Sequence, residues 1–256
     1  MKLSTLPGAL ALLATTTLSS QAVITTVSTS TPVATGGPSF FSDGSSDYFG
    51  IVSNTGTMIA GATFTSNLTS PPDGSLAGRD LDDGSTRPAT RTAEWQLSIA
   101  GIPNAASPFT NISFSGRIAA RDDNNAWDNA DPIDFITFEL LQDGAILTSE
   151  TKDYRSTAGL TFFNGNLALD TNGDGIGDGV HVPNASANPS LAQNASLTGT
   201  TANSTIVLRI TVHSDSGNEE FWVDGTLSAD VDIVPEPSSS LMLSLAGGFL
   251  LMRRKK

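Results

Sequence analysis

Apolar and polar side chains alternate along several stretches of the chain between residues 93 and 233. The clearest stretch runs through Ile206, Leu208, Ile210 and Val212, each separated by one residue that points the other way. A period of two places successive side chains on opposite faces of a strand, so these stretches predict strands with one face in the core. The apolar positions assigned to this core are Trp95, Leu97, Ile99, Ile112, Phe114, Ile118, Phe138, Leu208, Ile210 and Val212.

Other stretches add strands and a tight turn. Residues 133–142 are apolar on both faces, which is typical of a central strand. Asp143-Gly144 then gives the signature of a type I′ hairpin before a strand at 145–151. Residues 161–168 predict a further strand.

The last strand and the first long connection complete the pattern. Residues 221–233 predict one long strand with a bulge at Asp224-Gly225, or alternatively a hairpin at that point. Residues 66–91 predict a long loop. Because no segment between the chain ends has a convincing 3.6-residue period, about 8 to 11 short strands predict an all-β fold, a β-sandwich of jelly-roll type.

The first 22 residues have the pattern of a secretory signal peptide. Lys2 supplies a positive charge, an apolar helical run follows at 6–13, and Ser20-Gln21-Ala22 resembles a small-x-small cleavage site. The pattern predicts a signal at 1–22 and a secreted chain that starts at Val23.

The last 23 residues, 234–256, divide into three parts. Two prolines flank a glutamate, an apolar run at 241–252 contains one polar residue, and four cations end the chain. The run predicts a short transmembrane helix with a positive-inside stop. The residues of the extended first part are Val234, Pro235, Glu236 and Pro237.

This order of parts resembles the PEP-CTERM sorting signal of bacterial proteins that an exosortase processes. The resemblance implies export, transient anchoring in the membrane through the C-terminal helix, and cleavage near the Pro-Glu-Pro motif. It further implies delivery to the cell surface or the extracellular space, in bacteria that make exopolysaccharide.

Length and charge narrow the classes of partner. The segment 23–233 predicts a single domain, with two small domains as the alternative on length alone. It keeps 8 of the 13 basic and 25 of the 26 acidic residues, a net charge of about −17, which repels nucleic acid and favours divalent cations. Because the chain has no cysteine, disulfides and thiolate metal sites are excluded.

The segment 40–233 resembles, more loosely, the jelly rolls of carbohydrate-binding modules and their galactose-binding-like relatives. The similar residues are an early Phe-Ser-Asp-Gly at 41–44, a central Trp-Asp at 127–128, and a final Glu-Glu-Phe-Trp-Val-Asp at 219–224. The resemblance implies a structural calcium ion held by Asp43 and Asp224.

One loop has the ligand spacing of an EF-hand. Oxygen-bearing side chains occupy positions 1, 3, 5 and 9 of the segment 170–178, a glycine occupies position 6, and the residue at position 7 offers its carbonyl. Position 12 holds His181 in place of the usual glutamate, so the alternative is a solvated turn. The candidate calcium ligands are Asp170, Asn172, Asp174, Ile176 and Asp178.

A second acidic cluster spans residues 122–134 and includes Trp127, Asp128 and Asp134. It predicts either a calcium or sugar site with Trp127 as a stacking platform, or a turn-rich loop with Trp127 anchored in the core. Trp222 is out of phase with its apolar neighbours and is the better candidate for an exposed aromatic side chain that binds sugar.

Catalytic patterns are scarce in the sequence. Only two histidines are present, and none of the usual serine-hydrolase, zinc-protease or thiol motifs occurs. Glu219 and Glu220 are adjacent on a strand and point to opposite faces, so they cannot act as a pair of glycosidase carboxylates. The sequence predicts a non-enzymatic exported protein that contacts extracellular polysaccharide; the alternative is a secreted glycosidase or lyase with the same sorting tail.

Overall fold

The computed structural model describes residues 22–34, 40–43, 47–53, 58–59, 62–63, 68, 71–82, 87–106, 108–121, 127, 134–157, 166–183, 193–216 and 219–234. Apart from Ala22 and Val234, the predicted signal peptide and sorting tail lie outside these residues. Within the described ranges, no helix combines the length and apolar composition needed to cross a bilayer.

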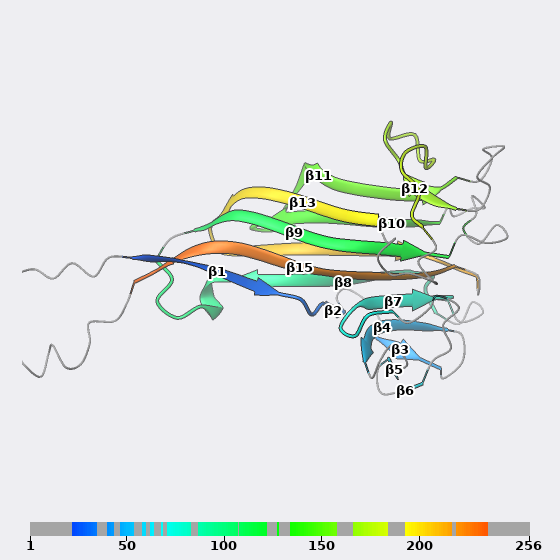
Figure 1. Ribbon diagram of the computed structural model, residues 1–256, viewed down its shortest axis with the longest axis horizontal. Helices are drawn as coiled ribbons and strands as arrows, with labels where there is room; N and C mark the ends of the chain where they lie inside the picture. The colour runs from blue at the N-terminus through cyan, green and yellow to red at the C-terminus, as the bar shows by residue number, and fades with distance from the viewer. Residues whose placement is uncertain are drawn as a thin grey trace, which may run out of the picture.

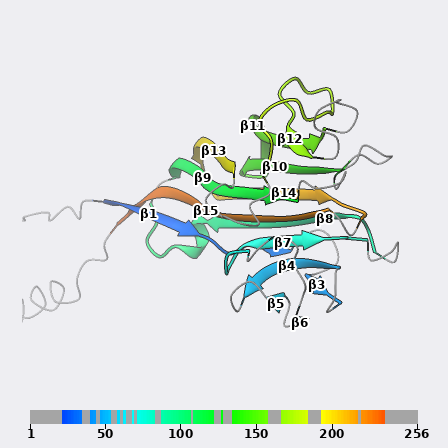
Figure 2. The ribbon, with the colours of Figure 1, turned by 45° about the vertical axis from the view of Figure 1, so that its right-hand side comes forward.

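The described chain is all-β, with two antiparallel sheets that pack as a β-sandwich (Figures 1 and 2). Its elements are β1 (Val23–Thr29), β2 (Val33–Ala34), β3 (Phe41–Ser42), β4 (Tyr48–Ser53), β5 (Met58–Ile59), β6 (Ala62–Thr63), β7 (Leu76–Arg79), β8 (Thr90–Ser98), the 3-10 helix η1 (Ile99–Gly101), β9 (Phe109–Ala120), β10 (Phe135–Gln142), β11 (Ala145–Ser156), β12 (Leu167–Leu169), β13 (Gln193–Ala202), β14 (Thr205–His213) and β15 (Glu220–Ile233). Sheet A has the order β13-β9-β15-β7-β4-β5-β6, with β1 on β15 and β3 on β4. Sheet B has the order β12-β11-β10-β14-β8-β2.

The strand pairs are nested along the chain. β10 pairs with β11, β9 with β13, β8 with β14 and β7 with β15, each antiparallel. This is the pairing of one long hairpin, and β9–β15 and β10–β14 contacts close it into two sheets. As a result, β14 and β15, consecutive in sequence, lie in opposite sheets.

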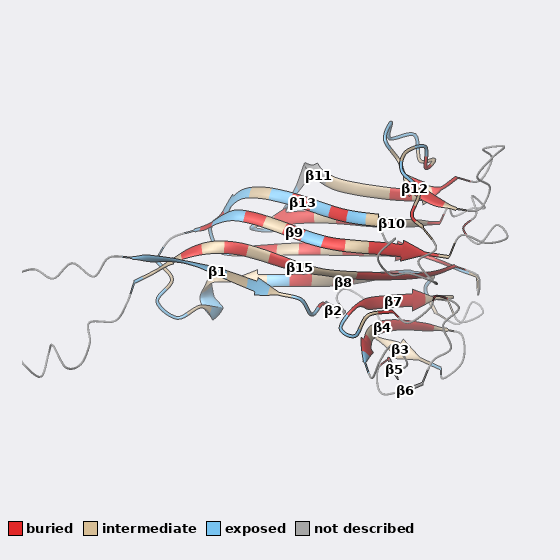
Figure 3. Ribbon diagram, viewed as in Figure 1, coloured by how far each residue is buried: buried red, intermediate tan, exposed pale blue. Residues whose placement is uncertain are grey.

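The core lies between the sheets, where the alternation predicted it (Figure 3). Eight of the ten predicted core residues are buried, and Leu97 and Ile99 are partly buried against them. Phe114 lies between two other aromatic rings, with ring centroids 5.8 Å from Trp95 and 6.3 Å from Phe138. The period-two analysis of these stretches is therefore confirmed.

A pair of glycines makes room for Phe114. Gly116 in β9 lies opposite Gly225 in β15, and an added Cβ would come within 2.5 Å of the Phe114 ring at Gly116 and 2.4 Å at Gly225. The ring therefore packs across bare backbone of both strands, and neither position accepts a side chain without displacing it.

The last strand, β15, confirms the prediction of one long strand and corrects the position of its bulge. β15 is a single strand of 14 residues, so there is no hairpin within it. Asp224 and Gly225 pair in register with β9, and the irregularity lies further along, between Ser228 and Asp230. There, two β9 residues oppose one β15 residue, and Asn111 takes a left-handed conformation with φ of 48°. The extra residue of this bulge belongs to β9. The glycine at 225, on which the predicted bulge position was based, gave no information about β9.

The turn between β10 and β11 is the predicted type I′ turn. Asp143 and Gly144 both have positive φ, 51° and 82°. The Asp143 carboxylate also accepts hydrogen bonds from the backbone N–H groups of Asn203, Ser204 and Thr205, at 2.6, 2.6 and 3.0 Å. It thereby joins this turn to the connection between β13 and β14. The strand predicted at 145–151 extends to Ser156.

The predicted loop at 66–91 contains a strand instead. β7 lies between β4 and β15 in sheet A, and Leu76, Ala77 and Gly78 are buried. A four-residue strand covered on both faces has no alternation to detect. The strand predicted at 161–168 lies mostly outside the described residues, which show a strand at Leu167–Leu169.

A smaller apolar cluster covers the other face of sheet A beside β4. Its members are Tyr48, Val52, Ile59, Leu68, Ala77, Ala119 and Trp222. The buried carboxylate of Glu220 lies beside this cluster. It accepts a hydrogen bond from the Tyr48 hydroxyl at 2.6 Å and another from the backbone N–H of Leu68 at 3.3 Å. Part of sheet A is therefore buried on both faces.

Candidate metal centre

The connection from β14 to β15 carries the chain from sheet B to sheet A. It begins after His213 and ends at Glu219, at the end of β15 opposite to Ile233. Asp134 directly precedes β10, whose first residue, Phe135, pairs with His213. The strand register therefore brings Asp134 next to this connection.

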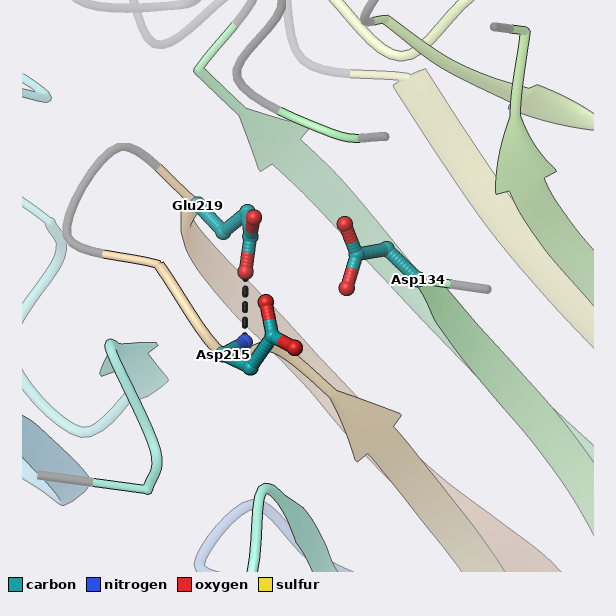
Figure 4. A group of neighbouring side chains, drawn as sticks. All are labelled: Asp134, Asp215 and Glu219. Atoms are coloured by element: carbon teal, nitrogen blue, oxygen red, sulfur yellow. Dashed lines mark hydrogen bonds between the residues drawn. The ribbon is translucent and has the colours of Figure 1, made fainter. Parts of the chain in front are cut away.

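Three carboxylates meet at this crossing (Figure 4). Asp134, Asp215 and Glu219 each offer one oxygen, and these oxygens all lie within 4.8 Å of one another. Asp134 is 1% exposed and Glu219 is 0% exposed, whereas Asp215 is exposed. We call this group the acidic triad. Two of its members are buried in the protein, and the third, Asp215, is exposed to solvent.

Glu219 holds the connection in shape with one of its two oxygens. Oε2 accepts hydrogen bonds from the backbone N–H groups of Asp215 at 2.6 Å and Ser216 at 2.8 Å. The other oxygen, Oε1, is buried and has no hydrogen-bond partner. A buried carboxylate oxygen without a donor is costly, which calls for a proton or a cation beside it.

Burial raises the pKa of Glu219 to about 9, and the nearby charge of Asp134 acts in the same direction. The two backbone donors on Oε2 oppose that shift without cancelling it. The groups that shift this pKa are carboxylates and backbone N–H groups, and no basic side chain is among them. Like charges crowded in a buried site leave two solutions, a retained proton or a bound positive ion.

The donor set suits a hard cation. All three side chains offer carboxylate oxygen, the ligand that calcium, magnesium and manganese prefer, and no thiolate or imidazole joins them. The acidic triad could therefore hold a metal ion. No other group of three or more acidic or histidine side chains converges in this way among the described residues.

No family model matches this chain, and no curated protein matches it.

The EF-hand-like loop uses its side-chain oxygens locally. Asp170 accepts hydrogen bonds from the N–H groups of Gly173 and Gly175, at 2.6 and 2.9 Å. Asp178 accepts one from the N–H of Thr171 at 2.8 Å, a contact that lowers the pKa of Asp178 together with the Thr171 hydroxyl. The carboxylates of Asp170, Asp174 and Asp178 do not converge as those of the acidic triad do. Calcium binding by this loop, with Asn172 and the Ile176 carbonyl, stays a prediction.

Asp43 and Asp224 cannot share one calcium ion. The pairings β3–β4, β4–β7 and β7–β15 place Asp43 level with the beginning of β15, whereas Asp224 lies further along it. The separation is about 17 Å along the strand direction and about three strand spacings across it. Two ligands of one calcium ion lie within about 5 Å of each other. Asp224 instead forms an ion pair with Arg117, so the predicted shared site is wrong.

The two tryptophans proposed for sugar binding are both buried. Trp127 is 0% exposed and packs against Phe221, with ring centroids 6.5 Å apart, so it is an anchor of the core. Trp222 is also 0% exposed, because the smaller apolar cluster covers the face of sheet A to which it points. Neither ring offers a stacking platform: the alternative of Trp127 as a core anchor is confirmed, and the prediction of an exposed Trp222 is wrong. Asp128 lies outside the described residues.

Sequence analysis found one member of the acidic triad and missed two. Asp134 was within the predicted acidic cluster, but Asp215 and Glu219 were not singled out as ligands. The available signal was a pair of acids on either side of the sequence Ser-Gly-Asn, between two predicted strands. That signal did not show that Asp134 would lie beside the turn, because the contact depends on the pairing of β10 with β14.

More acids lie at the edge of sheet A. Asp80 follows β7 with φ of 46°, and burial raises its pKa to about 7 with added contributions from Asp82 and Asp47. Beside them, Arg87 and Arg91 lie over the ring of Phe41, at 4.2 and 4.8 Å from its centroid.

The outer face of sheet A carries an open polar hollow of about 320 Å³. It lies over β13, β9 and β15, where short hydroxyl, amide and charged groups point outward. Its lining residues are Ser115, Gly116, Arg117, Asn194, Asp224, Gly225 and Thr226. The set offers donors and acceptors suited to sugar hydroxyl groups but no aromatic face.

Proposed function

We propose that this chain is an exported, non-enzymatic β-sandwich protein that a bacterial exosortase sorts to the cell surface or extracellular matrix. The supporting observation is the pairing of β1 with β15, in which Val23 lies opposite Ile233. The predicted start of the secreted chain and the beginning of the sorting tail therefore lie side by side (Figure 1). The acidic triad lies at the other end of β15, which spans 14 residues and about 45 Å.

This arrangement suits a tethered display protein. A tail that leaves from one end of the sandwich keeps the membrane and the exosortase at that end, before and during processing. The acidic end then faces away from the membrane, toward the extracellular medium and its polysaccharide.

The nested strand pairs support the finer description of the fold as a jelly roll. A long hairpin wrapped into two sheets is the connectivity of that fold, which carbohydrate-binding modules share. Because both candidate tryptophans are buried, the proposed polysaccharide contact is the polar hollow around Arg117 and Asp224. Its hydroxyl and charged groups would recognise sugar hydroxyls by hydrogen bonds.

Calcium is the cation proposed for the acidic end. Oxygen ligands, an acidic chain and the absence of cysteine all favour a hard divalent ion over zinc or copper. Extracellular delivery would expose the protein to more calcium than the cytosol offers.

The alternative, a secreted glycosidase or lyase, gains no support from the acidic triad. Asp134 and Glu219 are buried, so a sugar ring has no room between them and Asp215.

The sorting proposal is tested in a bacterium that contains an exosortase. The full chain carries an epitope tag after Lys256, and mass spectrometry reads the end of the secreted product. We expect loss of the tag, a new end near Pro235, and an intact anchored chain when the exosortase gene is deleted. A Glu236→Ala variant should keep the tag. Recovery of the intact end through Lys256 from the complete host would contradict the proposal.

A further inference from the structure

Glu219 has a buried carboxyl oxygen that the fold leaves without a hydrogen-bond donor. Its side chain is 0% exposed, one oxygen satisfies the connection between β14 and β15, and the other has no donor. One oxygen of this carboxyl group lies within 4.8 Å of an oxygen of Asp134 and an oxygen of Asp215 (Figure 4). Shaping the connection uses only Oε2, so a buried oxygen without a donor remains on a carboxyl group that lies beside two other carboxyl groups.

The acidic triad joins both sheets. Asp134 directly precedes β10 of sheet B, and its carbonyl accepts a hydrogen bond from the N–H of Ser156 at the end of β11, at 3.3 Å. Glu219 precedes β15 of sheet A, and Asp215 belongs to the segment between the sheets. One ion bound by all three would fasten the start of β15 to the start of β10.

The ligands indicate which ion this is. Three carboxylates exceed the charge of one divalent cation, and the exposed Asp215 leaves one side open to water, which can complete a coordination shell of six to eight oxygens. Calcium accepts such irregular oxygen shells, whereas magnesium requires a near-ideal octahedron and gives up water reluctantly. The set contains no nitrogen or sulfur ligand, which disfavours zinc.

We propose that Asp134, Asp215 and Glu219 bind one calcium ion, and that this ion locks the crossing between the two sheets at the acidic end of the sandwich. The inference rests on the proposed function, because export supplies the calcium. It assigns a structural role to the ion: with calcium bound the end of the sandwich is fixed, and without it no cation links the three carboxyl groups that join the two sheets there.

The test uses the full chain, purified in mild detergent and treated with a chelator. Isothermal titration with calcium chloride gives stoichiometry and affinity, and calorimetry gives melting temperatures in calcium and in chelator. We expect one calcium ion per chain through the acidic triad. Calcium at about 100 times the dissociation constant should raise the melting temperature by about 5 to 10 °C.

Two variants of the acidic triad and one control separate this site from others. Asp215→Asn alters an exposed ligand and should weaken binding by about tenfold or more. Glu219→Gln should abolish binding, yet melt at or above the unmodified chain in chelator, because glutamine keeps an acceptor for the N–H groups of residues 215 and 216 and cannot carry a charge beside Asp134. Asp174→Asn, in the exposed 170–178 loop, should bind calcium at the acidic triad as the unmodified chain does.

Three results would overturn the inference: no change of melting temperature with calcium, unchanged binding in both triad variants, or loss of the single site in Asp174→Asn. Magnesium that binds as tightly as calcium would overturn the choice of ion. Failure of sorting in cells leaves this experiment with purified protein unaffected, and a chain that binds no calcium can still be sorted. The two proposals therefore fail separately.

Discussion

Replacement of Phe114 by alanine tests how the two sheets are packed. The side chain is 1% exposed, contacts two aromatic rings, and lies across the Gly116–Gly225 pair. No neighbouring side chain extends from those glycines, so the cavity left by the ring has little that can collapse into it. We therefore expect a cost toward the upper part of the usual range for Phe→Ala, about 3 to 5 kcal/mol.

Such a loss is large compared with the total stability of a domain, about 5 to 15 kcal/mol. For a domain of this size it corresponds to a fall in melting temperature of about 6 to 20 °C. The measurement is urea denaturation of the full chain in detergent, followed by tryptophan fluorescence. Ile146→Ala, at an apolar residue that is 44% exposed, is the control and should change stability by less than about 0.5 kcal/mol.

A second substitution shows whether the glycines and the ring depend on each other. Gly225→Ala places a Cβ 2.4 and 2.6 Å from ring atoms of Phe114 and should cost about 1 to 3 kcal/mol. In the Phe114→Ala background most of that clash disappears, which predicts a coupling energy of about 0.5 to 3 kcal/mol. A loss well below 1 kcal/mol for Phe114→Ala, or strictly additive effects of the two changes, would refute the packing described for the core.

Three further predictions concern charged residues. Because the pKa of Asp80 is raised from 3.8 to about 7, its contribution to stability is complete below about pH 4 and is lost as the pH rises through 7. Asp80→Asn should flatten this part of the curve of melting temperature against pH, and an unchanged slope would show that Asp80 does not cause it. Asp143→Ala should lower the melting temperature more than Asp143→Asn. Asparagine keeps an acceptor for the N–H groups of residues 203–205 and tolerates the left-handed backbone of the turn. Equal melting temperatures for the two variants would contradict the bridging role of Asp143. Arg117→Ala should abolish the retardation of the chain by host exopolysaccharide in affinity electrophoresis. The control, Arg155→Ala, breaks the ion pair with Asp153 in sheet B and should leave the retardation unchanged. Equal retardation of both variants would show that the polar hollow does not bind polysaccharide.

Sequence periodicity predicted the part of the fold that follows from local pattern. Strands with one buried face, such as β14 and the middle of β9, show a period of two that needs no knowledge of the rest of the chain. The same reasoning failed for β7 and Trp222, because part of sheet A is covered on both faces. The second cover comes from residues near Ile59 and Leu68, distant in sequence from the strands that they bury.

The candidate site was less predictable for a related reason. The 170–178 loop has a recognisable spacing because all its residues are local, and its oxygens are used within the same loop. The acidic triad has no such spacing, since Asp134 meets Glu219 only through the pairing of β10 with β14 and the crossing that follows. Long-range register, not residue type, creates that site.

The position of β15 also determines how the protein would carry mechanical force. The predicted sorting tail follows Ile233 in the sequence, and β15 pairs with β9 along 221–230 and with β1 along 227–233. A pull between an anchored tail and a partner held at the acidic end runs parallel to this strand. The bonds on both of its sides then share the load in shear, instead of opening one after another as in a peeled hairpin. A tail attached to this central strand therefore comes loose only when β15 slides along both of its partner strands and its hydrogen bonds break together.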